Sequence, residues 1–107
     1  LNGGELDGVR ILSEEAVQIM RSNQLPDAVK NIADLYPGNV FGVDFAIVDE
    51  PEKYNGAPRG THWWWGIAGS WFWIDPVEDI IVIGMIQNSN ILYSLEVHAA
   101  IREALYQ

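Results

Sequence analysis

The sequence predicts an α+β domain in which an antiparallel β-sheet meander is flanked by helices. Three apolar runs separated by short turns lie between residues 61 and 87, and helical patterns precede and follow them, at residues 13–22 and 91–106. Short connections favour antiparallel neighbours, because parallel strands need a long crossover. The helices are then expected to pack on the sheet. At 107 residues the chain is long enough for one domain or part of one.

The N-terminal residues predict a hairpin followed by a helix. Asp7-Gly8 tolerates positive φ at both positions, which predicts a tight hairpin over residues 5–11. Ser13 is a suitable N-cap, and the two glutamates that follow it oppose the positive end of a helix dipole. A helix is therefore expected to start there and to end near residue 22. Residues 25–39 give mixed signals, with a short helix as one possibility.

The middle of the chain predicts the strands of the sheet. Residues 40–48 are rich in β-branched and aromatic side chains, which favours one strand, and the proline- and glycine-containing residues 49–60 predict a surface loop. Three further strands are expected at residues 61–68, 70–74 and 80–87. The last is apolar nearly throughout, which is typical of a central strand that is covered on both faces.

The C-terminal residues predict a helix from about Ile91 to Tyr106 that packs on the sheet. One side of this helix carries apolar residues at helical spacing. They are Val97, Ala100, Ile101, Ala104 and Leu105.

Charge and composition exclude several classes of function. Six basic and fifteen acidic residues give a net charge of −9, which repels nucleic acids and anionic membranes. No apolar run approaches the roughly 18 to 20 residues of a membrane span, so we expect a soluble protein. Cysteine is absent, which removes disulfides and thiolate chemistry but leaves the cellular compartment open.

The two histidines do not predict a metal site. His62 and His98 fall on different predicted elements, and neither has a partner at ligand spacing. His98 is expected at the surface or boundary of the last helix. No metal or other cofactor is predicted.

All five tryptophans lie between Trp63 and Trp73. Alternation along a strand places His62, Trp64 and Gly66 on one face and Trp63, Trp65 and Ile67 on the other. Trp71 and Trp73 are expected in the core. For the strand with Trp64 and Gly66, a packed core, an aromatic ligand platform and one wall of an active site all remain open, because glycine in a strand often marks a close approach by a ligand.

Two stretches resemble a known family. Residues 1–13, LNGGELDGVRILS, and residues 69–76, GSWFWIDP, are similar to the C-terminal portion of the serine β-lactamase, DD-peptidase and esterase superfamily, especially its class C-like and family VIII esterase-like members. The resemblance implies the C-terminal part of the β-lactamase/transpeptidase-like fold. It also implies a parent protein that cleaves a small ester or amide through an acyl-serine intermediate.

The resemblance also implies a substrate-binding wall. The family has a K-T-G element or a variant such as W-G-G on the strand beside the active site, and the matching residues here are Trp64, Trp65 and Gly66, followed by Ile67. The Ile67 N–H would be the second donor of an oxyanion hole, and His62 is a possible cleft-lining residue. The lysine of K-T-G is missing, which favours neutral esters over substrates that are held by a carboxylate.

The catalytic motifs of that family are absent from this chain. No serine begins an S-x-x-K motif and no tyrosine begins a Y-x-N motif, so no catalytic residue is predicted here. We expect residues 1–107 to be a single partial domain that is inactive alone and has an unpaired strand edge and an uncovered apolar face. Its partner would be the complementary N-terminal segment or a second copy. The alternative is a non-catalytic binding or structural module with an aromatic ligand surface.

Overall fold

A five-stranded antiparallel sheet forms the centre of the molecule. The computed structural model describes residues 1–106. The strands follow one another in chain order across the sheet, which makes the structure an α+β domain with an antiparallel sheet, as predicted. They are β3 (Asn39–Phe41), β4 (Ala46–Val48), β5 (His62–Trp65), β6 (Trp71–Asp75) and β7 (Ile80–Gly84).

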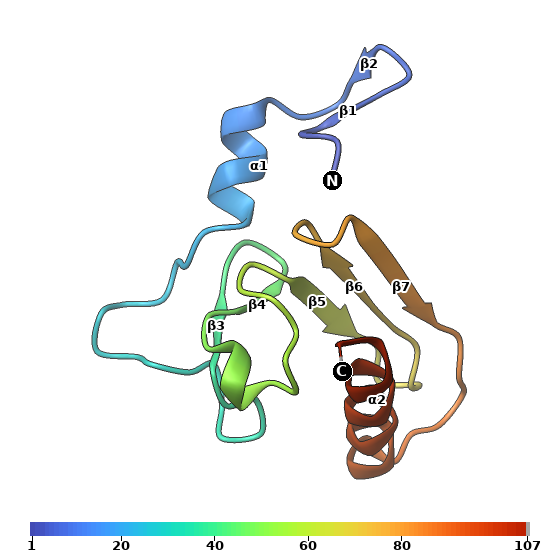
Figure 1. Cartoon of the computed structure of the whole chain (residues 1–107). Helices are drawn as coiled ribbons and strands as arrows, with labels where there is room; N and C mark the ends of the chain where they lie inside the picture. The colour runs from blue at the N-terminus through green and yellow to red at the C-terminus, as the bar shows by residue number, and fades with distance from the viewer. Residues whose placement is uncertain (107) are drawn as a thin grey trace.

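The N-terminal hairpin and helix form as predicted. Strands β1 (Glu5–Leu6) and β2 (Val9–Arg10) pair through a turn in which Asp7 and Gly8 have φ values of 51° and 79°. Helix α1 (Glu14–Met20) begins at Ser13, whose hydroxyl oxygen accepts a hydrogen bond from the Ala16 N–H at 3.0 Å. Hairpin and helix lie to one side of the sheet (Figure 1), so α1 does not cover a face of the sheet.

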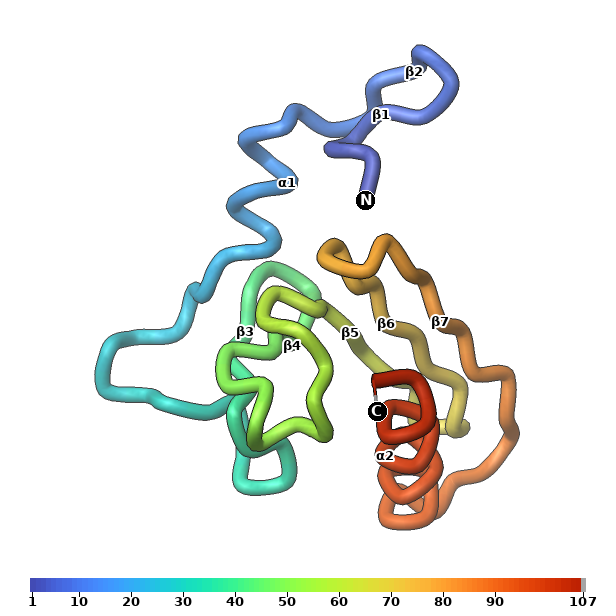
Figure 2. Tube along the Cα trace, in the orientation of Figure 1, coloured from blue at the N-terminus to red at the C-terminus, as the bar shows by residue number. Residues whose placement is uncertain are grey.

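Residues 21–38 contain turns and bends but no helix or strand, so the short helix considered for residues 25–39 is absent. Figure 2 shows this stretch as a long excursion between α1 and β3. The Asn31 side chain accepts a hydrogen bond from the Gly38 N–H at 3.0 Å, and the Ile32 N–H donates to the Asn39 carbonyl at 3.0 Å. These hydrogen bonds to Asn39 of β3 and to Gly38 just before it replace the hydrogen bonds that a helix would supply.

The prediction of one strand over residues 40–48 is wrong, because the chain reverses direction at its centre. The Gly42 N–H donates to the Phe45 carbonyl at 2.9 Å, and Asp44 has a φ of 69°. A side chain on Gly42 would overlap the Met20 carbonyl, so glycine is needed where α1 meets this turn. β3 and β4 are therefore separate strands, while residues 49–60 are a loop that contains the short 3₁₀ helix η1 (Pro51–Lys53).

The predicted meander is present, but the predicted position of its last strand in the sheet is wrong. β5, β6 and β7 pair in succession, and Trp64, Phe72 and Ile83 lie side by side across them. β7 is an edge strand rather than a central one. Ile81 and Ile83 on it are 56% and 66% exposed, although residues of the N-terminal hairpin border a hollow together with Ile81.

Helix α2 (Ile91–Tyr106) has the predicted bounds, yet it turns a different side to the sheet. Ala100, Ala104 and Leu105 are exposed, whereas Ser94, His98 and Arg102 are buried. The expectation that His98 is a surface or boundary residue is also wrong, since it is 1% exposed and its ring lies 4.7 Å from that of Trp71. The buried indoles of β6 offer flat aromatic surfaces on which polar rings pack.

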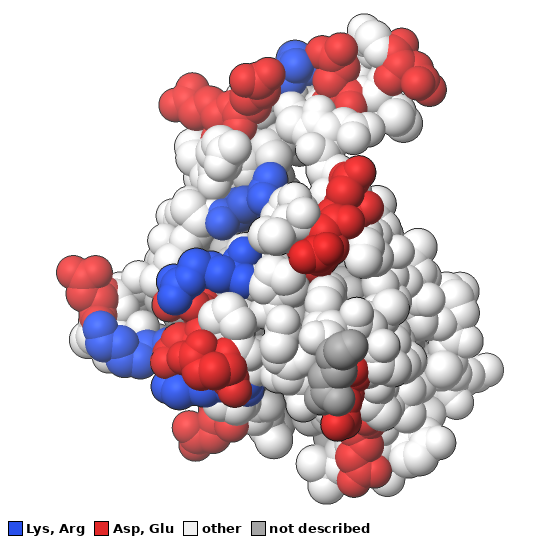
Figure 3. All heavy atoms as spheres, viewed as in Figure 1, with Lys and Arg blue, Asp and Glu red and all other residues white. Residues whose placement is uncertain are grey.

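The sheet has one covered and one open face. Trp63, Trp71 and Trp73 are 3–5% exposed, and α2 lies over this covered side (Figure 1). In the space-filling view, charged side chains gather over the N-terminal hairpin and the β3–β4 side, whereas the surface on the right, over β6 and β7, is largely uncharged (Figure 3). No helix in residues 1–106 has the length and apolar character needed to cross a bilayer.

Candidate functional site

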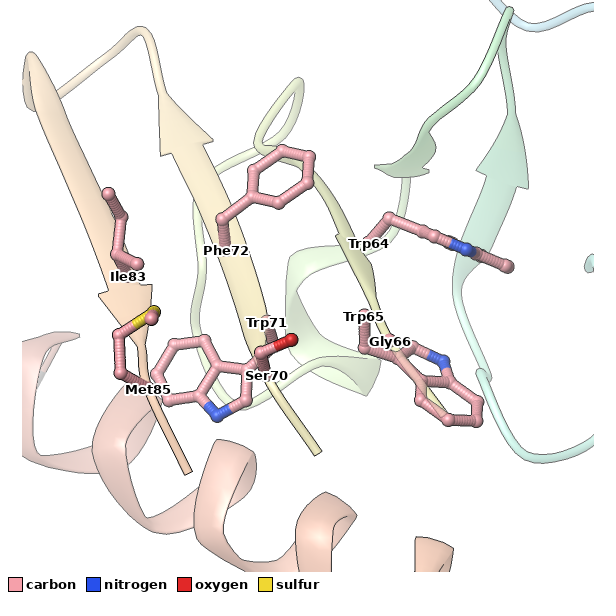
Figure 4. A pocket seen from close by; sticks show the side chains of 8 residues that line it. All are labelled: Trp64, Trp65, Gly66, Ser70, Trp71, Phe72, Ile83 and Met85. Atoms are coloured by element: carbon pink, nitrogen blue, oxygen red, sulfur yellow. The ribbon is translucent and has the colours of Figure 1, made fainter. Parts of the chain in front are cut away.

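An apolar cavity of about 490 Å³ lies where β5 ends and β6 begins, beside the end of β7. The side chains that form its walls come from β5, β6, β7 and the turn between β5 and β6 (Figure 4). None of them is charged, so the cavity suits an uncharged apolar group. The lining residues are Trp64, Trp65, Gly66, Ser70, Trp71, Phe72, Ile83 and Met85.

Three of the four residues predicted for the substrate-binding wall therefore meet at one cavity. Trp64 is held from the β3 side, where the Phe41 ring meets its indole edge-on at 5.2 Å between centroids. The Trp65 Nε1–H donates a hydrogen bond to the Tyr36 hydroxyl oxygen at 2.9 Å. Both indoles are half-buried and have defined partners on the protein side, so they form a fixed wall.

Gly66 begins the tight turn that ends β5. Its N–H donates to the Ser70 carbonyl at 2.7 Å, and its carbonyl accepts from the Gly69 N–H at 2.8 Å. A Cβ on Gly66 would lie 3.1 Å from the Ser70 Oγ, so the glycine leaves space beside the serine hydroxyl at the rim of the cavity. Gly69 has a φ of 99°, and a Cβ there would lie 2.7 Å from the Asn88 carbonyl oxygen.

Ile67 lies outside the strand to which the sequence assigned it. It occupies the second position of the turn from Gly66 to Gly69, and its side chain is 86% exposed. Its N–H has no hydrogen-bond partner in residues 1–106, as is usual at this position of a β-turn. Ile67 does not line the cavity, but Gly66 and Ser70 on either side of it do.

His62 is not at the cavity. It is 4% exposed, its Nδ1 lies 3.1 Å from the Gly60 carbonyl oxygen, and its ring centroid is 5.4 Å from that of Phe45. Burial lowers the pKa of His62. His62, the expected cleft-lining histidine, is therefore a buried neutral ring. It lies two residues before Trp64, on the same face of β5.

The structure adds cavity residues that were not selected from the sequence. Phe72 and Ile83 lie beside Trp64 in the register of the sheet, and Met85 follows β7 with 84% exposure. Two-residue alternation along the predicted meander was a signal for Phe72 and Ile83, because neighbours in register share a face. Ser70 had no such signal, since its place depends on the turn.

The buried tryptophans do not form a ligand platform. Trp71 and Trp73 are stacked at 4.8 Å with an angle of 13° between their planes, but they are 5% and 3% exposed. They form core, as predicted. Carbohydrate-binding platforms need wet, coplanar indoles, and the half-buried neighbours Trp64 and Trp65 are tilted by 31°.

The cavity supplies shape and main-chain groups, not acid–base chemistry. No histidine, carboxylate or basic side chain lines it. The described part of the chain also contains no group of three or more His, Asp or Glu side chains placed to hold a metal ion. What the site offers is an apolar wall next to a turn with a free N–H.

Comparison with known proteins gives two relatives from Mycobacterium tuberculosis. They are Protein Rv1367c of strain ATCC 25618 / H37Rv and Uncharacterized protein MT1414 of strain CDC 1551 / Oshkosh. Each is 35% identical to this chain over 96 residues, which is 82% of this chain and 24% of the relative. The chain thus spans about a quarter of the length of these curated relatives. No family model matches the chain.

Proposed function

We propose that this chain is the C-terminal portion of a β-lactamase-like serine hydrolase and forms one wall of its active site. The observation that carries the proposal is the uncharged cavity against Trp64, Trp65 and Gly66, next to the free N–H of Ile67. The length of the relatives supports it, because this stretch matches only a quarter of each. The nucleophile and its base would come from the remainder of the parent.

In the proposed reaction the chain positions a neutral ester. The serine oxygen of the parent forms a bond to the ester carbonyl carbon, and the carbonyl oxygen becomes negatively charged in the tetrahedral intermediate. The alcohol then leaves with a proton, and water hydrolyses the acyl-serine. The Ile67 N–H would donate to the developing oxyanion, and the half-buried indoles would hold the apolar part of the substrate.

The oxyanion role of Ile67 is tested by Ile67→Pro in the parent, with Ile67→Ala as the matched control. Proline removes the N–H and suits the second position of a β-turn, so the turn from Gly66 to Gly69 should form. Alanine removes the same side chain but keeps the N–H. We expect Ile67→Pro to lower kcat for a chromogenic ester by about 10²–10³-fold and Ile67→Ala to leave it nearly unchanged. Equal kcat values for the two variants would contradict the role.

The chain alone should not turn over a chromogenic ester or cephalosporin, because it has no S-x-x-K serine. Turnover by the purified chain that a serine-directed inhibitor abolishes would defeat this part of the proposal. If the parent also lacks a serine that such an inhibitor labels, the non-catalytic alternative is the better account. The half-exposed apolar wall then serves as an aromatic ligand surface.

We also propose that the open side of the sheet is covered by the remainder of the parent or by a second copy. β7 has a free edge, and Ile81, Ile83 and Met85 along it are 56–84% exposed, a row of apolar side chains beside unpaired backbone groups that another chain could cover. Sedimentation of the chain should show self-association that Ile83→Lys reduces. The control Leu92→Lys, at a position 61% exposed on α2, which lies over the covered face, should not change it. A stable dilute monomer of the unsubstituted chain would contradict the proposal.

A further inference from the structure

Arg102 is a buried cation that has no acidic partner among residues 1–106. It lies on α2 with 6% of its surface exposed, and no carboxylate of residues 1–106 lies within 4.0 Å of its nitrogens. By contrast, Arg10 and Arg59 at the surface both form ion pairs. A buried charge is costly unless an opposite charge compensates it.

The partners that Arg102 does have are neutral. Its guanidinium carbon lies 3.9 Å from the centre of the Tyr54 ring, and its Nη2–H donates to the Asn55 side-chain oxygen at 3.3 Å. The buried Nε has no hydrogen-bond partner in the described part of the chain. The guanidinium therefore keeps a net charge. Because its Nε is shielded, the donors left for an anion are those of Nη1, which forms no hydrogen bond within residues 1–106.

A separate cavity of about 220 Å³ has Arg102 in its lining. It is formed where the residues after η1 meet α2, and its lining includes Tyr36, Tyr54, Asn55 and two charged side chains, Lys53 and Arg102. Both charges are positive, although the chain has fifteen acidic and only six basic residues. Lys53 is already paired with Glu50 at 2.6 Å. Of the two cations in this lining, Arg102 is thus the one whose charge is not compensated by a carboxylate.

We propose that this cavity binds a carboxylate, with Arg102 as the residue that recognises it. A guanidinium and a carboxylate match in charge and in planar, two-point geometry. A single uncompensated cation fits a monoanion better than a doubly charged phosphate, because the second charge would itself be buried without a partner. The carboxylate comes either from a free small molecule or from a side chain of the parent outside these residues.

The site is tested by NMR on the 107-residue chain, with potassium acetate as the probe and potassium chloride at equal ionic strength as the reference. The Arg102 Nε–Hε signal reports on the guanidinium. The Trp65 indole N–H reports on the cavity, because Tyr36 lines it and accepts the hydrogen bond of that indole. We expect both signals to shift to saturation with acetate and not with chloride. Titration curves that are the same for potassium acetate and potassium chloride would overturn the proposal.

Two variants separate the site from general effects of salt. Arg102→Met keeps the apolar stem but removes the donors, so the apparent affinity for acetate, read at Trp65, should fall about tenfold or more. Arg59→Met removes a surface arginine whose side chain is 68% exposed, and it should leave the titration unchanged. If Arg102→Met does not fold, the Arg102 signal of the unsubstituted chain still decides the question.

The same titration on the parent identifies the source of the carboxylate. An Arg102 signal already at its acetate-saturated position indicates a carboxylate side chain of the parent, whereas one that titrates indicates a free ligand. A signal that neither sits there nor responds would overturn the proposal for the assembled protein. Only this arm uses the parent that the proposed function implies, so failure of that function leaves the test on the chain intact.

Discussion

Gly84 sits opposite Trp71 in the pairing of β6 with β7, and the indole occupies the space that a side chain would need. A Cβ at position 84 would overlap the ring atoms Cε2, Nε1 and Cζ2 of Trp71. The backbone itself permits alanine, because Gly84 is not among the residues with positive φ. Gly84→Ala therefore introduces a steric clash without backbone strain.

The cost follows from how tightly Trp71 is held. The indole would have to retreat by on the order of 1 Å or more to restore normal contact distances, but Trp73 stacks at 4.8 Å and the His98 ring lies at 4.7 Å. Overpacking of this kind costs about 1–3 kcal/mol, and replacing a strand glycine with alanine returns about 0.5–1 kcal/mol. We expect a net loss of about 1–2 kcal/mol in the free energy of unfolding.

Urea denaturation followed by tryptophan fluorescence measures this loss. Gly66→Ala is the matched control, since Gly66 also lacks a positive φ and a Cβ there would lie 3.1 Å from the Ser70 hydroxyl and 3.7 Å from the Ser70 carbonyl oxygen, without overlap. That variant should stay within about 0.5 kcal/mol of the unsubstituted chain. Should Gly84→Ala unfold at the same urea concentration as Gly66→Ala, the packing of Trp71 between β7 and α2 is not as described.

Two further substitutions test the core. Burial, aided by the Arg102 cation, lowers the pKa of His98 to about 4 from its usual 6.5; below pH 6.5 the unfolded chain binds a proton that the folded chain does not. The free energy of unfolding should therefore be at its full value above pH 6.5 and fall by at most about 3 kcal/mol as the pH drops to about 4. His98→Gln should remove this decline. An identical pH profile for that variant would contradict the burial of a neutral ring. Asn39→Ala removes the side-chain oxygen that accepts the buried Trp63 indole N–H at 2.8 Å; we expect a loss of about 1–3 kcal/mol in urea denaturation, and unchanged stability would show that the bond contributes nothing.

Local chemistry made parts of the fold predictable. The hairpin over residues 5–11 depends on two residues that tolerate positive φ, and the start of α1 depends on the Ser13 hydroxyl. Both signals act within four residues of chain, so no distant contact is needed to read them. The bounds of α2 were also predicted from its own residues, although its apolar periodicity indicated the wrong buried side.

The candidate site was only partly predictable. Trp64, Trp65 and Gly66 were selected through the family resemblance and do line one cavity, although alternation placed the two indoles on opposite faces of the strand. The position of Ile67 in the turn depends on where β5 stops. The place of Ser70 in the cavity wall depends on the Gly66–Ser70 hydrogen bond, which no residue pattern predicted.

By itself the sequence determined the N-terminal hairpin, the starts of both helices, the β5–β7 meander and the burial of Trp71 and Trp73. Tertiary structure alone decided that residues 40–48 fold back on themselves, that β7 lies at an edge, and that α2 buries His98 and Arg102 instead of its alanines. The reason is physical: periodicity shows that a segment has an apolar side, but only the neighbours that actually pack against it determine which side is buried.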